Sequence, residues 1–193
     1  MVDPEESECE RLLQEGDPEA IPRLLKRYNR PLLSFLCHQV GDRTAAEDLM
    51  QEVLVRVWRN REGYEAQGRL SGWLFTIARR LAIDHLEKES RRPKPLGAQR
   101  DEDGAQAPSP QDRLLDPSTP ERELESAGTR SRIEAAIAAL PEEQRETFLL
   151  REYGGVSFAE IAQMTGSPLG TALARMRYAV LKLRKTLGES DAI

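Results

Sequence analysis

The fold of this chain is decided by residues 157–168, which read SFAEIAQMTGSP. Ser157 and Glu160 have the spacing of a capping box, in which each residue's side chain bonds the backbone N–H of the other at a helix start. Gly166 is suited to end that helix, and Pro168 fits the first turn of a second helix. The stretch therefore predicts two helices joined by a very short turn.

The second of these helices is expected to bury one apolar stripe, made of Leu169, Ala172, Met176, Val180, Leu183 and Leu187. Residues 171–187 carry five basic residues and no acid. The side chains expected to project outward are Thr171, Ala174, Arg175, Tyr178 and Lys182, with Leu173 and Arg177 near the boundary. A short helix, a tight turn and a basic second helix are typical of a reader of the DNA major groove. A plain helical hairpin inside a core is the alternative.

The rest of the chain also predicts helices, because its apolar residues recur at intervals of three and four. Six of the twelve prolines lie between Pro93 and Gly128, a composition typical of a linker. We expect an all-α protein with two small helical domains at 1–92 and 120–187, a flexible Pro-rich linker at 93–119 and a tail at 188–193. Free in solution, the two domains are expected to be loosely coupled.

Sequence signals also predict the helix limits within these domains. A helix is expected to begin at Asp17-Pro18 and to end near Gly41. The next should start at Thr44, which has capping-box spacing to Glu47. Further helices are expected from Trp73 and at 121–139 and 141–153.

Charge is segregated along the chain, whose 28 basic and 33 acidic residues give a net charge of −5. Residues 1–20 carry eight acids against one base, whereas residues 71–100 carry seven bases against three acids. The two basic stretches, here and at 171–187, predict two phosphate-facing surfaces, although solvated helix faces would look the same. No apolar run is long enough to span a membrane, and the acid-rich start is unlike a signal peptide, so a cytoplasmic location is expected.

Three further stretches carry recognisable motifs. Residues 45–58 read AAEDLMQEVLVRVW, and residues 71–86 read SGWLFTIARRLAIDHL. These two resemble the core-binding region 2.2 and the promoter-melting helix of the bacterial sigma-70 family of RNA polymerase factors. Residues 139–145 together with 155–162 resemble region 4. Their order and spacing resemble the two-domain extracytoplasmic-function (ECF) group. The resemblance implies a sigma factor that directs promoter recognition, DNA melting and transcription initiation, with no catalysis, cofactor or metal of its own.

The resemblance also implies the protein partners. In the family, the polar face of region 2.2 docks on the β′ clamp of core RNA polymerase, and region 4 docks on the β flap. The expected polymerase contacts here are Asp48, Gln51, Glu52 and Arg56. Acidic side chains on an exposed helix face suit a basic partner. By analogy with the family, an anti-sigma factor is expected as a further partner.

The minus-10 element is expected to meet the loop at 60–69 and the helix after it, where a base must be held out of the stack. The expected minus-10 DNA contacts are Arg61, Tyr64, Arg69, Arg79, Arg80 and Lys88. Tyr64 can either stack on a base or pack inside the protein. The family more often has an asparagine where this chain has Arg80, which favours a phosphate contact at that position.

The minus-35 element is expected to meet the second helix of the helix-turn-helix. Where the family usually has Val-Lys-Ser-Arg, residues 172–175 read ALAR. The expected minus-35 DNA contacts are Thr171, Leu173, Ala174, Arg175, Arg177, Tyr178 and Lys182. Leu173 and Ala174 can meet only thymine methyl groups, so Arg177 and Tyr178 are the best candidates to read base edges.

The family places the two DNA elements about one and a half helical turns apart, a distance of about 50 Å. An extended linker over residues 93–118 spans up to about 85 Å, so it can bridge them.

Other functions are compatible with parts of this sequence. One alternative is a regulator that binds DNA through the helix-turn-helix without polymerase, and another is a sigma mimic that binds an anti-sigma factor without initiating. An enzyme would have to use His38, Asp84, His85 and the two cysteines, and no catalytic motif joins them. Cys9 and Cys37 with His38 could sense a metal or an oxidant, although packed thiols are the simpler interpretation.

Overall fold

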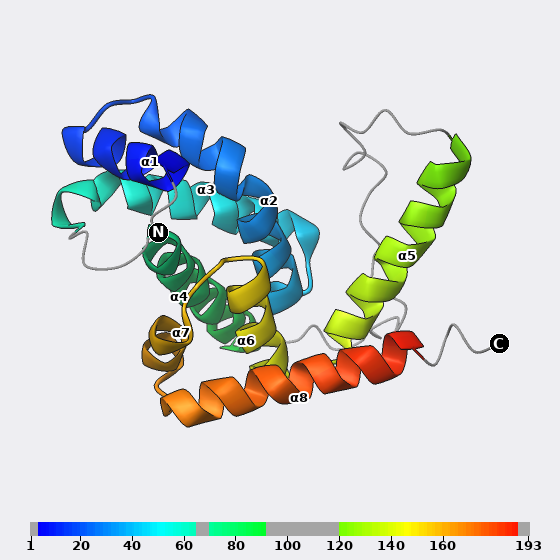
Figure 1. Cartoon of the computed structure of the whole chain (residues 1–193). Helices are drawn as coiled ribbons and strands as arrows, with labels where there is room; N and C mark the ends of the chain where they lie inside the picture. The colour runs from blue at the N-terminus through cyan, green and yellow to red at the C-terminus, as the bar shows by residue number, and fades with distance from the viewer. Residues whose placement is uncertain (1–3, 65–69, 92–119, 189–193) are drawn as a thin grey trace.

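The computed structural model describes residues 4–64, 70–91 and 120–188, and it confirms an all-α fold (Figure 1). Over these residues the chain forms eight α-helices, one short 3-10 helix and no strand. The elements are α1 (Pro4–Glu15), α2 (Ala20–Val40), α3 (Arg43–Arg59), η1 (Arg61–Gly63), α4 (Leu70–Arg91), α5 (Pro120–Ala138), α6 (Glu142–Glu152), α7 (Phe158–Thr165) and α8 (Leu169–Gly188). The predicted linker, residues 93–119, lies outside the described residues.

The N-terminal half is a bundle in which α2, α3 and α4 pack against one another. Each helix turns one apolar stripe inward, because its large apolar residues recur every three or four positions. Phe35 of α2 and Phe75 of α4 meet edge to face, with ring centroids 5.4 Å apart, and both side chains are fully buried. This aromatic pair forms the centre of the bundle.

Helix α1 was not among the predicted helices, the first of which was expected to begin at Asp17-Pro18. It packs on α2 through Cys9, Leu12 and Leu13, which are buried. Glu6 is also buried, and its carboxylate accepts hydrogen bonds from the Tyr28 hydroxyl (3.1 Å) and the Ser71 backbone N–H (3.2 Å). A buried carboxylate needs such donors to offset its desolvation. Glu6 therefore ties α1 to α2 and to the start of α4.

The junction between α2 and α3 differs in one detail from the expectation. Gly41 ends α2 as predicted, in the left-handed region with φ of 73°. The cap of α3 is Asp42 rather than Thr44: the Asp42 carboxylate accepts a hydrogen bond from the Ala45 backbone N–H at 2.7 Å. Asp42 follows Gly41 directly and provides a negatively charged hydrogen-bond acceptor. This charge is favourable there because the N-terminus is the positive end of the helix dipole.

The predicted helix-turn-helix is confirmed in the C-terminal half. The Ser157 side chain accepts a bond from the Glu160 N–H (3.3 Å), and the Glu160 carboxylate accepts one from the Ser157 N–H (2.9 Å). Gly166 ends α7 in the left-handed region with φ of 64°. The very short connection then leads directly into α8, which packs on both α6 and α7.

Replacing Ser157 with Ala should therefore lower the free energy of unfolding by about 1 kcal/mol, the usual cost of removing a helix N-cap. Urea unfolding followed by circular dichroism would measure it. The matched control is Ser131→Ala on the exposed face of α5, which should stay within about 0.5 kcal/mol of the wild type. Equal stability of the two variants would contradict the role of the capping box.

The expectation of loosely coupled domains is wrong for this structure. Helix α2 contacts α6, α4 contacts α7, and the buried apolar residues of both halves belong to one cluster. Figure 1 shows α6 and α7 lying between the N-terminal bundle and α8. The sequence argument considered only the length and composition of the linker, whereas the coupling comes from surfaces that fit one another directly.

Candidate functional site

The first candidate surface is the α3 face, formed by Asp48, Gln51, Glu52 and Arg56. Asp48 and Gln51 are exposed, while Glu52 and Arg56 are half-buried. The opposite side of α3 carries the buried residues Ala46, Met50, Val53 and Val57, so helical periodicity turns the polar residues outward. Glu52 accepts a bond from the Arg56 guanidinium at 2.9 Å, one turn along. The α3 face is therefore mainly polar, with Val55 also 40% exposed beside it, and its acid that is not paired with Arg56 is Asp48.

Tyr64 is packed inside the protein in this structure. Its side chain is buried, its ring lies 4.7 Å from that of Trp73, and its hydroxyl donates a hydrogen bond to Glu10 at 2.8 Å. Burial, followed by the bond to the Glu10 carboxylate, raises the pKa of Tyr64 above its ordinary value. Of the two options that the sequence left open for Tyr64, the structure shows packing, and the ring is not exposed for stacking on a base.

The cations predicted to meet the minus-10 element lie in different surroundings. The Arg61 guanidinium donates to the Trp58 carbonyl oxygen at 2.8 Å and lies over the Trp58 ring, so it is engaged with the protein. Arg80 and Lys88 are exposed on α4. Arg69 lies outside the described residues.

Arg79 points inward, to the C-terminal half. Its Nε donates to a carboxylate oxygen of Glu146 at 2.8 Å, and the two side chains are only 23% and 14% exposed. A phosphate would have to compete with Glu146 for the Nε of Arg79 at that position. The sequence analysis did not single out Glu146, because one acid on an amphipathic helix carries no signal of a partner 67 residues away.

On α8 the structure exposes Leu173, Arg177 and Tyr178, and Tyr178 is 59% exposed. Thr171 and Ala174 are half-buried. The buried stripe differs from the prediction. Ala172 and Leu183 are buried as expected, and Ala179 is buried as well, whereas Met176, Val180 and Leu187 are only half-buried and Leu169 is 49% exposed. Leu169 stands at the first position of α8.

Two other cations of the predicted minus-35 set, Arg175 and Lys182, have partners within the C-terminal half. The Arg175 guanidinium contacts a carboxylate oxygen of Glu143 at 2.6 Å, and Lys182 donates to the Ala139 carbonyl oxygen at 2.9 Å. Arg175 is the better shielded of the two, with 18% of its side chain exposed. The exposed residues of the predicted minus-35 set are therefore Leu173, Arg177, Tyr178 and Lys182.

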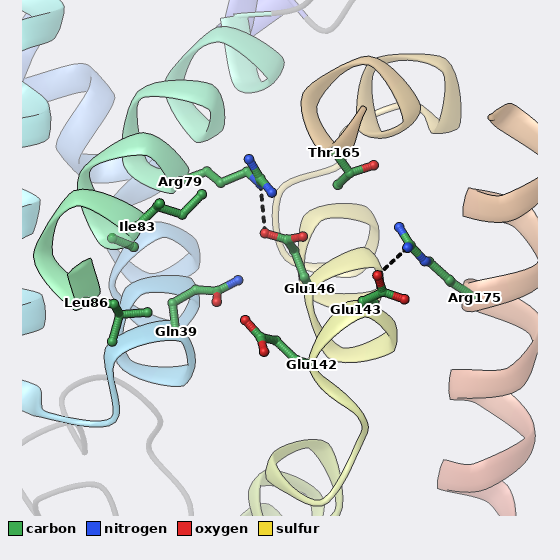
Figure 2. Close-up of a pocket in the computed structure, with 10 residues that line it drawn as sticks. Gln39, Arg79, Ile83, Leu86, Glu142, Glu143, Glu146, Thr165 and Arg175 are labelled. Carbon is green, nitrogen blue, oxygen red and sulfur yellow. Dashed lines mark hydrogen bonds and ion pairs between the residues drawn. The ribbon is translucent and has the colours of Figure 1, made fainter. Parts of the chain in front are cut away.

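An interdomain cleft of about 280 Å³ lies beside these ion pairs. Figure 2 shows Arg79 and Arg175 approaching α6 from opposite sides, with Glu146 facing Arg79 and Glu143 facing Arg175. Gln39, Ile83 and Leu86 line the cleft on the side of the N-terminal half. Helix α6 thus places Glu146 beside Arg79 of α4 and Glu143 beside Arg175 of α8, and both of these helices are predicted to contact DNA.

The cysteines and His38 do not form a ligand cluster. Over the described part of the chain, no three His, Cys, Asp or Glu side chains come together as metal ligands would. Cys9 is buried, and its burial raises the pKa of the thiol, which favours the unreactive protonated form. The His38 ring nitrogen Nε2 instead meets a Glu134 carboxylate oxygen of α5 at 2.6 Å.

No helix within the residues that the structure describes combines the length and the apolar character needed to cross a bilayer.

Comparisons with known proteins identify the family to which this chain belongs. Residues 24–92 match the family described as Sigma-70 region 2, and residues 130–183 match Sigma-70, region 4. The ECF RNA polymerase sigma factor SigL of Mycobacterium tuberculosis is 37% identical over 159 residues, covering 82% of this chain and 83% of the relative. The RNA polymerase sigma-H factor of Pseudomonas aeruginosa is 28% identical over 175 residues, covering 91% and 90%.

A solved structure shares the fold. The sigma factor RpoE of Bartonella quintana, determined in complex with the anti-sigma factor NepR, superposes with a TM-score of 0.60 at 23% identity, covering 86% of this chain and 95% of that one. The two matched regions occupy the α2–α4 bundle and the helices from α5 to α8 described above. The chain belongs to the sigma-70 family, in its ECF group of RNA polymerase sigma factors.

Proposed function

We propose that this ECF sigma factor binds core RNA polymerase through the α3 face and directs promoter recognition and melting through α4 and α8. The observation that supports the proposal is that part of each predicted set is exposed on a helix of a matched region: Asp48 and Gln51 on α3, Arg80 and Lys88 on α4, and Arg177 and Tyr178 on α8. The α3 face is exposed and polar, and α8 exposes Arg177 and Tyr178 on a helix that follows a short turn. Such a helix fits the major groove.

Each surface would act by contact rather than by covalent chemistry, since a sigma factor is an initiation factor and not an enzyme. The α3 face would dock on the β′ clamp, and the C-terminal half would dock on the β flap. Arg80 and Lys88 would hold phosphates beside the minus-10 element, and the loop before α4 would hold the unstacked base. Arg177 and Tyr178 would read the minus-35 element, with Leu173 against thymine methyl groups.

Two further parts of the proposal concern control and location. The solved RpoE relative is bound to an anti-sigma factor, which supports a similar negative regulator for this chain. Since the proposed partners are polymerase and promoter DNA, we also propose that the protein works in the cytoplasm.

Run-off transcription tests the proposal directly. Core polymerase would be mixed with the purified chain and with fragments of the source genome, and transcripts would be mapped. New start sites that depend on both the chain and the core enzyme are expected. Sequence-specific DNA binding without polymerase association would instead support the free-standing regulator, and polymerase binding without transcripts would support the mimic.

A further inference from the structure

Two carboxylates of α1 hold the residues on either side of the segment 65–69, which lies just before α4. Tyr64 precedes this segment directly, and its hydroxyl donates a hydrogen bond to Glu10 at 2.8 Å. Ser71 is the second residue after the segment, and its backbone N–H donates to Glu6 at 3.2 Å. Helix α1 therefore contacts both ends of the segment with the same kind of acceptor.

The spacing of the two acids on α1 allows both contacts at once. Glu6 and Glu10 are four residues apart, so they lie on the same face of the helix and about 6 Å apart along its axis. Glu8 lies on the opposite face, where it pairs with the exposed Arg11 at 2.9 Å. Glu6 and Glu10 are thus directed at the N-terminal bundle.

The groups that α1 holds are shielded from water. Glu6, Tyr64 and Ser71 are all buried, and the Tyr64 ring also packs on that of Trp73 with centroids 4.7 Å apart. A hydrogen bond to a carboxylate is stronger than one between neutral groups, and it is stronger still where water does not compete. Both ends of the segment 65–69 are therefore firmly attached to the bundle.

Helix α1 lies outside the Sigma-70 region 2 match, which begins at residue 24. Its apolar residues Cys9, Leu12 and Leu13 pack it on α2. Glu6 and Glu10 add contacts that extend beyond α2 to the residues flanking the segment 65–69. These two contacts are thus a feature of this chain that the family match does not include.

We propose that Glu6 and Glu10 are positioning residues for promoter melting, because they fix the two points at which the segment 65–69 leaves and rejoins the bundle. The inference rests on the proposed function, in which the loop before α4 holds the unstacked base. A base taken out of the duplex must be bound well enough to offset the loss of stacking and pairing. Fixing the ends of a binding loop in advance lowers the entropic cost of ordering it on its ligand, which leaves more of the binding energy for the base.

The test measures promoter opening by core polymerase loaded with each full-length variant. The probe is a promoter fragment, mapped by run-off transcription, that carries 2-aminopurine in its minus-10 element and becomes more fluorescent when this base unstacks. Glu10→Ala removes the acceptor of the Tyr64 hydroxyl, and Tyr64→Phe removes the donor and keeps the ring. Both should lower the equilibrium constant for opening by about fivefold or more, since a loop positioned for only part of the time binds with an affinity reduced by that fraction. The double variant should open no worse than either single variant, because both changes remove the same bond.

Two further variants are matched controls. Glu8→Ala makes the same change on the opposite face of α1, so it should open the promoter as well as the wild type does. Glu10→Gln keeps an oxygen that accepts the Tyr64 hydrogen bond, so opening should stay within about twofold of the wild type. All these variants should bind core polymerase with equal affinity, since none of the changed residues lies on the α3 face.

A second template separates positioning from a loss of structure. In this template the two strands of the minus-10 element are not complementary, so no base has to be unstacked from a duplex. Run-off transcription by Glu10→Ala and Tyr64→Phe should there come within about twofold of the wild type, because the cost that positioning helps to offset is absent. Glu6→Ala tests the other end of the segment. It also leaves the Tyr28 hydroxyl without its acceptor and should destabilise the fold more, so the Glu10 and Tyr64 variants decide the outcome.

The results distinguish this inference from the proposed function. Opening at the wild-type level by both Glu10→Ala and Tyr64→Phe overturns the inference and leaves the proposed function intact. Equal losses on the duplex and on the open template show that the two residues only support the fold, which also overturns the inference. A wild-type chain that binds no polymerase or opens no promoter refutes the proposed function, and the positioning role is refuted with it.

Discussion

Replacing Phe75 with Ala should lower the free energy of unfolding by about 3–5 kcal/mol, the cost measured for removing a buried aromatic side chain. The Phe75 side chain is fully buried and packs edge to face on Phe35 at the centre of the N-terminal bundle. Its ring also packs against Gly154 of the C-terminal half. The substitution therefore leaves a cavity at the centre of the bundle and removes a contact between the halves.

Urea unfolding followed by circular dichroism would measure this loss. Val55→Ala on α3 is the control, because Val55 is 40% exposed and its truncation should change the stability by less than about 1 kcal/mol. A Phe75→Ala protein as stable as the control would show that the Phe35–Phe75 pair is not at the centre of the fold.

Replacing Asp48 with Arg should weaken binding to core polymerase by about tenfold to a hundredfold. Asp48 is exposed on the α3 face, and its neighbour Glu52 is already partly neutralised by Arg56. Placing a cation opposite a basic partner surface introduces like-charge repulsion, which costs several kcal/mol at the centre of an interface, and each 1.4 kcal/mol is a factor of ten. Titration of core polymerase with labelled sigma would give the affinities.

The control for this variant is Glu19→Arg, which makes the same acid-to-arginine change at an exposed position at the start of α2. Its affinity for polymerase should stay within about twofold of the wild type, because the charge lies outside the α3 face. Circular dichroism of both variants should match the wild type, since neither residue is buried. If Asp48→Arg and Glu19→Arg bind equally well, the polymerase contact lies elsewhere on the chain.

Several features of the structure could be predicted from residues that lie close together in the sequence. The capping box at Ser157 and the left-handed Gly41 and Gly166 follow from residues one to four positions apart, and the structure confirms each of them. The α3 face follows from helical periodicity in the same way. These features depend on short-range geometry, which residue order specifies directly.

Other features depend on pairs far apart along the chain. Glu6 looks like one of several solvated acids, yet it accepts a bond from Ser71, 65 residues away. Tyr64 could have met DNA or the protein, and only its position beside Trp73 and Glu10 decides for packing.

The sequence alone determined seven of the eight described α-helices, the capping box of α7, the helix-turn-helix and the family resemblance, because repeating patterns and short motifs carry that information locally. Only the tertiary structure decided that the two halves meet and that Arg79 is held by Glu146, 67 residues away. The physical reason is that an ion pair or a close packing contact depends on the fit of two finished surfaces. Such a fit forms only when the helices have docked. The residues that form it therefore show no periodic pattern in the sequence from which the contact could be predicted.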